Sequence, residues 1–260
     1  MTDAPTAALL IIGNEILSGR TQDANLAFLA KYLGGLGIRF REARVVPDEE
    51  AEIVAAVNAL RARYTYVFTT GGIGPTHDDI TAECVATAFG LPLIRHPEAA
   101  RRLEAHYAGT GMLNEARMRM ANTPDGAVLI DNPVSTAPGF QIGNVFVLAG
   151  VPIIMQAMLT GIGDRLVGGP VVRTRSVLSG VPEGTFADGL RGLAVEHAGV
   201  DIGSYPAFRQ GKVSTALVLR ATDEAALEAA VTAVTVLLRG LGGDPVVLDG
   251  YGDTGDQASS

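Results

Sequence analysis

The chain has 260 residues, of which 47% are hydrophobic and 18% charged, and its formal net charge is -8. This balance is typical of a soluble globular protein, and the acidic charge argues against binding to nucleic acid or to an anionic membrane. Cys84 is the single cysteine, which excludes an internal disulfide and a cysteine-based zinc site. The apolar run at residues 7–12 is too short for a signal peptide or a membrane-spanning helix, so we expect a cytoplasmic protein.

Before residue 170, apolar runs alternate with segments of helical periodicity, and glycine or proline turns separate them. We expect strands at residues 8–12, 39–46, 66–70, 127–130 and 145–148. Helices are expected at residues 24–36, 49–62, 80–90 and 97–120, and from Pro152 onward. The alternation predicts an α/β domain in which helices cover both faces of a mostly parallel sheet.

A different pattern begins after Gly168, Gly169 and Pro170. We expect strands at residues 171–178, 200–205 and 212–220, a turn at 208–211, and helices at 183–198 and 223–239. This β-α-β-β-α order is typical of a small α+β domain. The predicted organisation is therefore a first domain at 1–169, a second at 170–250 and a disordered polar tail at 251–260.

The segment TTGGIGPTHDDIT, residues 69–81, joins a strand to a helix through a glycine-rich turn. The turn contains Gly71, Gly72, Gly74, Pro75 and Thr76. Glycine lets the backbone approach a ligand closely, and amide groups at a helix start attract phosphate. Turn geometry alone could also explain the glycines, and Thr76 with Asp79 resembles a helix capping box.

Ligands of open α/β sheets bind at the carboxyl ends of the strands. This rule gathers Glu15, Asp48, the loop at 71–79, the loop at 132–139 and the turn at 150–152. Ser18, Asn132 and Gly139 lie in these loops and are further candidates for ligand binding. We expect Glu15, Asp48 and Asp79 to hold a divalent cation that bridges to phosphate, with Asp78 and Asp79 as catalytic residues. Solvated surface carboxylates are the alternative.

Several other chemistries are disfavoured by the motifs. The turn is not followed by the lysine of a P-loop, and the first strand leads into GNEILSG rather than a Rossmann fingerprint. The chain has no G-x-S-x-G elbow of a serine hydrolase. Arg117 and Arg119 could neutralise a phosphate or lie on a solvated helix face.

Five segments, IIGNEILSGRTQDAN, VVPD, FTTGGIGPTHDDIT, NPVSTAPGF and LAGVP, together resemble the competence/damage-inducible protein A (CinA) family. The resemblance is to its molybdopterin-binding domain, which molybdenum-cofactor biosynthesis proteins share, and it spans about residues 7–167. It implies a three-layer α/β/α fold with a pocket for a pterin phosphate or nucleotide diphosphate. By position, Glu15, Asp48 and Asp79 match acidic residues of the family, and Gly71 to Thr76 match its glycine loop.

The resemblance also implies a function. Similar proteins are described as metal-dependent pyrophosphatases that act on ADP-ribose or FAD, which suggests Mg, Mn or Co as the cation. The alternative is a non-catalytic protein that binds molybdopterin or handles a cofactor. Two-domain relatives suggest a homodimer. The chain ends before a nicotinamide-nucleotide deamidase domain could fit, so we do not expect deamidase activity.

Overall fold

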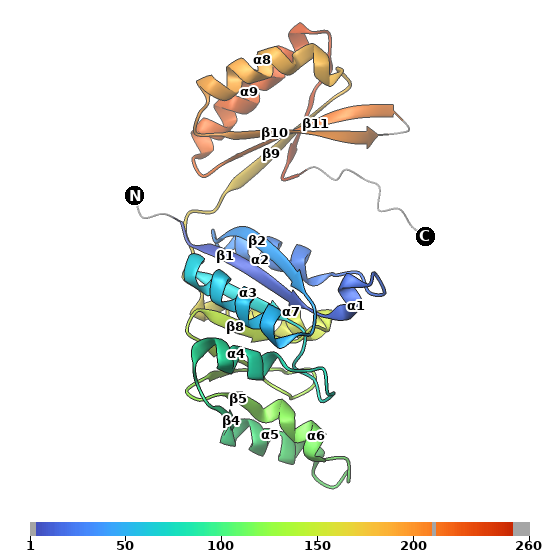
Figure 1. Ribbon diagram of the computed structural model, residues 1–260. Helices are drawn as coiled ribbons and strands as arrows, with labels where there is room; N and C mark the ends of the chain where they lie inside the picture. Colours follow the sequence, from blue (N-terminus) through green and yellow to red (C-terminus); the bar gives the residue numbers. More distant parts are fainter. Residues whose placement is uncertain (1–3, 210–211, 252–260) are drawn as a thin grey trace. The chain divides into compact units, whose positions relative to one another are not determined.

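The computed structural model describes residues 4–209 and 212–251, so most of the expected tail lies outside the described residues. Its contacts divide into two compact units, Met1–Gly169 and Pro170–Ser260 (Figure 1). Within the described residues, none of the helices combines the length and apolar character that crossing a bilayer requires. Each unit has its own hydrophobic core and is described separately.

The first unit is built on a six-stranded sheet with the order β2-β1-β3-β8-β7-β6. Its strands are β1 (Thr6–Ile12), β2 (Arg39–Val46), β3 (Tyr66–Thr70), β6 (Val128–Ile130), β7 (Gly139–Ile142) and β8 (Val145–Leu148). Neighbours among β2, β1, β3 and β8 pair in parallel, whereas β7 is antiparallel to β8 and to β6. The predicted mostly parallel sheet is confirmed. The strand β7 was expected to be the end of a loop.

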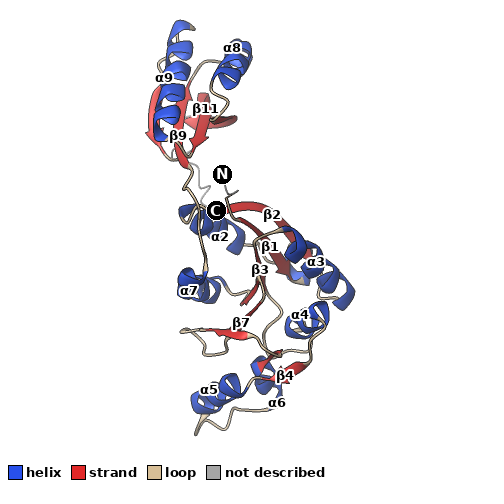
Figure 2. Ribbon diagram, turned by 90° about the vertical axis from the view of Figure 1, so that its left-hand side faces the viewer, coloured by secondary structure: helices blue, strands red, loops and turns tan. Residues whose placement is uncertain are grey.

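Helices cover both faces of this sheet (Figure 2). One layer holds α2 (Asn25–Gly35) and α7 (Pro152–Gly161), and the other holds α3 (Glu50–Arg63) and α4 (Thr81–Phe89). Strand β1 shows why, because all of residues 7–12 are buried. Side chains alternate along a strand, so Ala7, Leu9 and Ile11 pack into the α2/α7 core. Ala8, Leu10 and Ile12 pack into the α3/α4 core.

Short elements replace parts of the expected loops and helices. The helix expected at 97–120 is broken into α5 (Pro97–Tyr107), α6 (Glu115–Met118) and the 3-10 turn η1 (Arg119–Ala121). Gly109 and Gly111, both at positive φ, lie in the break. A two-stranded antiparallel ribbon, β4 (Leu93–Arg95) with β5 (Asn122–Pro124), brackets this region. The remaining short elements are α1 (Asn14–Leu17) and η2 (Gly163–Arg165).

The second unit is a four-stranded antiparallel sheet with two helices on one face. Its strands are β9 (Arg173–Ser179), β10 (Asp201–Arg209), β11 (Lys212–Ala221) and β12 (Val246–Asp249), in the order β10-β11-β9-β12. Helices α8 (Glu183–Glu196) and α9 (Glu224–Gly240) supply the rest of its core. Strand β10 runs four residues beyond the predicted end at Tyr205, and residues 210–211 of the expected turn lie outside the described residues. Strand β12 was not predicted.

A hydrogen bond to a carboxylate joins β2 to the residue that follows α3. The Tyr64 hydroxyl donates to Glu42 Oε2 at 2.5 Å, and Arg44 Nε donates to Glu42 Oε1 at 2.5 Å. The Tyr64 hydroxyl and then Arg44 lower the pKa of Glu42 below its ordinary value. The Glu42 side chain is 22% exposed, so solvent only partly screens these contacts.

Replacing Tyr64 by phenylalanine should lower the free energy of unfolding by about 1 kcal/mol at about pH 7. Because the folded-state pKa of Glu42 is depressed, its contribution is present above the unfolded-state pKa and is lost as the pH falls through the folded value. Urea unfolding at about pH 7 and about pH 3 measures the difference. Tyr66→Phe is the control, because the Tyr66 hydroxyl bonds the backbone of Val167 and not a carboxylate. An equal loss for Tyr64→Phe at both pH values would contradict the assignment.

Candidate functional site

A cleft of about 520 Å³ lies at the carboxyl ends of the parallel strands. The segments that follow β1, β3, β6 and β8 line it, together with Met120 of η1. Its lining comprises Glu15, Thr21, Gly72, Ile73, Gly74, Pro75, Asp79, Met120, Asn132, Ser135, Ala137, Ala149, Gly150, Val151, Pro152 and Ile154. Asp48, Asp78, Ser18 and Gly139 do not belong to this lining.

The turn after β3 has a backbone conformation that requires glycine. Gly71 has φ 101°, and a Cβ atom there would lie 2.1 Å from the carbonyl oxygen of Ile12 at the end of β1. Gly72 has φ 67°, and its Cβ would lie 2.2 Å from Thr81 Oγ1. The buried hydroxyl of Thr81, the first residue of α4, donates to the carbonyl of Gly71 at 3.0 Å. Thr81 therefore fixes the turn to the helix, a role that the sequence analysis did not assign.

Asp79 stabilises the middle of the same loop. Its Oδ2 accepts hydrogen bonds from the Thr76 amide at 2.8 Å and the Thr76 hydroxyl at 2.5 Å. A Cβ atom on Gly74 would lie 2.6 Å from this oxygen, so the carboxylate packs against the glycine. Helix α4 begins only at Thr81, so the pair Thr76 and Asp79, which resembles a capping box in sequence, is instead a contact within the loop.

Arg119 contacts the other side of the glycine loop. Its Nη2 donates to the carbonyls of Pro75 at 2.9 Å and Thr76 at 3.0 Å. The guanidinium of Arg117 instead lies over the ring of Tyr107. Arg119 therefore adds a positive charge beside the loop and holds its shape at the same time.

Two side chains near the loop, Asp78 and Cys84, have pKa values shifted in opposite directions. The side chain of Thr76, then the backbone amide of Asp78 itself, and to a smaller extent His77, lower the pKa of Asp78. The Asp78 side chain is 59% exposed, so we find it on the loop surface rather than in the cleft, unlike Asp79. Burial raises the pKa of the Cys84 thiol on α4 to about 12, which keeps that thiol unreactive.

The three carboxylates expected to share a cation do not form one group. Asp48 Oδ2 accepts the Asn14 amide hydrogen at 2.9 Å, which fixes the start of α1 to the end of β2. The carboxylate of Glu15 folds back over Gly13 and lines the cleft. Within residues 4–209 and 212–251, no three Asp, Glu, His or Cys side chains are placed to hold a metal ion. The hydroxyl of Ser18 donates to the Glu15 carbonyl, so it belongs to the α1 turn.

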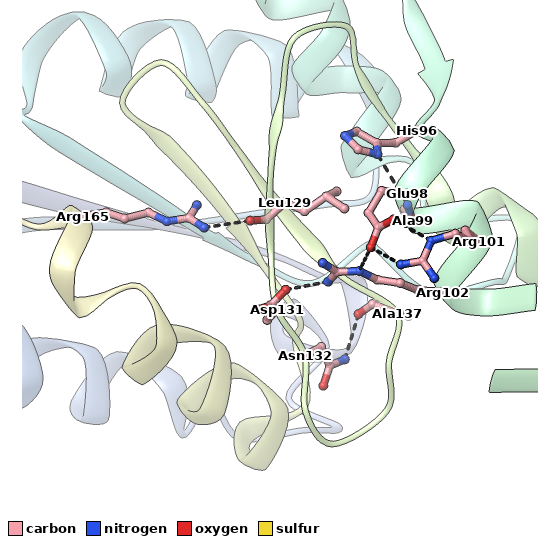
Figure 3. Close-up of polar contacts among 10 residues, drawn as sticks. All are labelled: His96, Glu98, Ala99, Arg101, Arg102, Leu129, Asp131, Asn132, Ala137 and Arg165. Carbon is pink, nitrogen blue, oxygen red and sulfur yellow. Dashed lines mark hydrogen bonds and ion pairs between the residues drawn. The ribbon is translucent and has the colours of Figure 1, made fainter. Parts of the chain in front are cut away.

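Asn132 organises the loop between β6 and β7 (Figure 3). Its amide nitrogen donates to the Ala137 carbonyl at 2.8 Å and to a loop hydroxyl, and its oxygen accepts two loop amides. Arg102 on α5 holds the preceding Asp131 at 2.5 Å and also pairs with Glu98. Arg101 and Arg102 lower the pKa of Glu98 to about 2. The hydrogen bonds of the Asn132 side chain thus hold the shape of the loop, and the residue also lines the cleft.

Gly139 has a packing role in β7. It is buried, and a Cβ atom there would lie 2.2 Å from the carbonyl oxygen of Val147 on β8. The strand pairing therefore accounts for the glycine, and Gly139 does not line the cleft, so its expected place among the ligand-binding residues stays a prediction.

Comparison with known proteins gives this geometry a context. Residues 8–167 match the family described as probable molybdopterin binding domain, and residues 171–241 match the FAD synthase middle domain. A CinA-like protein of Gloeobacter violaceus is 33% identical over 99% of this chain and 62% of its own length. The crystal structure of CinA from Thermoplasma acidophilum is 36% identical and superposes with a TM-score of 0.59, covering 63% of this chain and 99% of that one.

The chain belongs to the CinA-like molybdopterin-binding family. This confirms both the family and the three-layer fold expected from the motifs. The probable FAD synthase of Caenorhabditis elegans is also similar, at 33% identity over 92% of the chain, but the chain spans only 51% of its length. The CinA-like chain therefore corresponds to part of these longer relatives.

The close approach of Gly71 to β1 gives a test of the glycine loop. Gly71→Ala should lower the free energy of unfolding by about 3 kcal/mol, because it adds a backbone clash to left-handed strain. Gly90→Ala is the matched control, since Gly90 has φ 65° with no atom within 4 Å of its Cβ position. It should lose only about 1 kcal/mol. Urea unfolding compares the two variants, and equal losses would argue against the clash.

Proposed function

We propose that this CinA-like chain binds a nucleotide or pterin diphosphate in the cleft and hydrolyses its pyrophosphate bond with a divalent cation. ADP-ribose and FAD are the substrates to test first. One observation carries the proposal: a cleft of about 520 Å³ combines a glycine-rich loop with the carboxylates of Glu15 and Asp79. Its volume is in the range of small-molecule sites.

The backbone of the loop supplies donors for phosphate. Within the part of the chain that the structure describes, the amides of Gly72, Ile73 and Gly74 donate to no protein acceptor, and all three residues line the cleft. Consecutive free amides of this kind bind anions. Because Asp79, Thr81 and Arg119 already fix the loop, little conformational entropy is lost when a phosphate binds.

Glu15 and Asp79 are the carboxylates suited to a cation. A cage made only of protein side chains is not formed by the described residues. Magnesium often binds through one or two carboxylates and the substrate phosphates, and the two acidic side chains of the cleft fit that mode. When bound, the cation would polarise a phosphoryl oxygen. Glu15 and Asp79 would hold the ion, and the glycine loop would orient the phosphates.

The second candidate is a binding protein that uses the same cleft without cleavage. Two hydrogen bonds from Thr76 to Asp79 support it, since they assign that carboxylate a structural role. In this case the chain would bind molybdopterin and leave pyrophosphate bonds intact.

Incubation of the full chain with ADP-ribose or FAD and Mg²⁺, Mn²⁺ or Co²⁺ tests the first candidate by release of AMP. Glu15→Gln keeps the size of the side chain and removes its charge, so we expect a rate loss of about tenfold or more with unchanged thermal stability. Glu52→Gln on the exposed face of α3 is the control. Molybdopterin binding without turnover under any of these conditions would favour the second candidate.

Asp79→Asn separates charge from loop structure. The substituted side chain still offers an oxygen to Thr76, so the thermal stability should change little while hydrolysis falls by about tenfold or more. Thr76→Val is the complementary variant, because it keeps the charge of Asp79 and removes one loop hydrogen bond. It should lower stability more than activity. Full activity of Asp79→Asn would restrict Asp79 to its structural role.

A further inference from the structure

A smaller cavity of about 70 Å³ adjoins the cleft on the side of α2. It shares Glu15, Thr21, Gly150 and Pro152 with the cleft, so the two spaces meet at the carboxyl ends of β1 and β8. Its other polar walls include Asn25, the first residue of α2, and Thr70, the last residue of β3. Neither residue was among those predicted to bind a ligand.

Asn25 and Thr70 are almost completely buried, at 4% and 2% exposed. The Asn25 amide nitrogen donates to the Gly150 carbonyl at 2.8 Å, and this bond fixes the orientation of the side chain because a carbonyl can only accept. The remaining Asn25 Oδ1 and the Thr70 hydroxyl have no hydrogen-bond partner among the described residues. Buried polar atoms are normally paired, so two unpaired ones on residues that line the same cavity point to a bound group.

The cavity wall carries several acceptors, beside Gln22 and Thr21, whose side chains can also donate. Asn25 Oδ1 and the carboxylate of Glu15 can only accept hydrogen bonds, and the Thr70 hydroxyl can accept or donate. Asp23 also lines the cavity, with Oδ1 accepting the Leu26 amide. Two carboxylates disfavour a phosphate here despite the helix N-terminus. The cavity of about 70 Å³ has room for one or two hydroxyl or amino groups.

We propose that Asn25 and Thr70 form a specificity subsite that accepts a neutral hydrogen-bond donor of the bound ligand, a ribose hydroxyl or a ring amino group. The inference rests on the proposed binding of a diphosphate at the glycine loop. Thr70 directly precedes Gly71, so one strand end carries both the start of the phosphate loop and a wall of the subsite. The subsite would therefore contact the part of the ligand next to its phosphates.

Thr70→Val tests the hydroxyl with little structural disturbance, because the Thr70 hydroxyl makes no hydrogen bond within the described residues. Thr69→Val is a matched control: Thr69 is equally buried and its hydroxyl is equally unpaired, but it faces the α3/α4 layer and does not line the cavity. Both variants should keep or raise the thermal stability. Asn25 is less suitable as a probe because its replacement would also free the Gly150 carbonyl.

The binding of ADP with Mg²⁺ is measured by calorimetry for wild type and both variants. We expect Thr70→Val to weaken binding about fivefold and Thr69→Val to leave it unchanged. 2′-Deoxy-ADP, 3′-deoxy-ADP and purine riboside diphosphate, which lacks the amino group, identify the donor. The analogue that lacks it should bind wild type more weakly and should lose no further affinity in Thr70→Val.

Equal affinities of Thr70→Val, Thr69→Val and wild type for ADP would overturn the subsite, as would a wild type that binds all three analogues as tightly as ADP. These outcomes leave the proposed hydrolysis standing if AMP is still released from ADP-ribose. Conversely, selective ADP binding without hydrolysis supports the subsite and removes the catalytic proposal. A wild type with no affinity for ADP also overturns the subsite, and release of AMP from ADP-ribose then decides the proposed hydrolysis by itself.

Discussion

The site depends on how closely three strand ends approach one another. Gly71 after β3 lies against the last carbonyl of β1, and a Cβ atom on Gly150 after β8 would lie 3.2 Å from the Cα atom of Gly71. Side chains at these positions would separate the strands just where the cleft begins. Because the backbones meet here, the loops that follow diverge from a common centre and enclose the cleft between them.

Most of the polar side chains around the cleft maintain this geometry instead of facing a ligand. Asp48 holds the start of α1, Asp79 holds Thr76, and Asn132 holds its own loop. Among the described residues, the groups left free include main-chain amides in the glycine loop, the carboxylate of Glu15, and the buried oxygens of Asn25 and Thr70. Binding energy in such a site comes from donors and acceptors that are already oriented, so the network behind them matters as much as the contacts themselves.

The sequence was sufficient to locate the site but not to assign its side chains. The continuous apolar run 7–12 requires cover on both faces, which predicted the layers, and strand ends in a parallel sheet share one edge, which predicted the cleft. Strand β7 could not be predicted because it begins at Gly139, directly after a polar loop. The packing of Gly139 against Val147 of β8, which identifies the strand, is a tertiary contact. Likewise, the direction of each carboxylate depends on tertiary contacts, such as that of Asp48 with Asn14, which have no local signature.

The charge of the cleft links the two candidate functions. Glu15 and Asp79 both line a space that would receive a diphosphate, in a chain whose net charge is -8. The two carboxylates would repel the two phosphates unless a positive charge offsets the repulsion. Arg119 is already hydrogen-bonded to the carbonyls of Pro75 and Thr76, which leaves a cation to supply that charge. A divalent cation would therefore be needed for binding as much as for cleavage. Metal dependence of binding alone cannot distinguish an enzyme from a carrier, whereas release of AMP can.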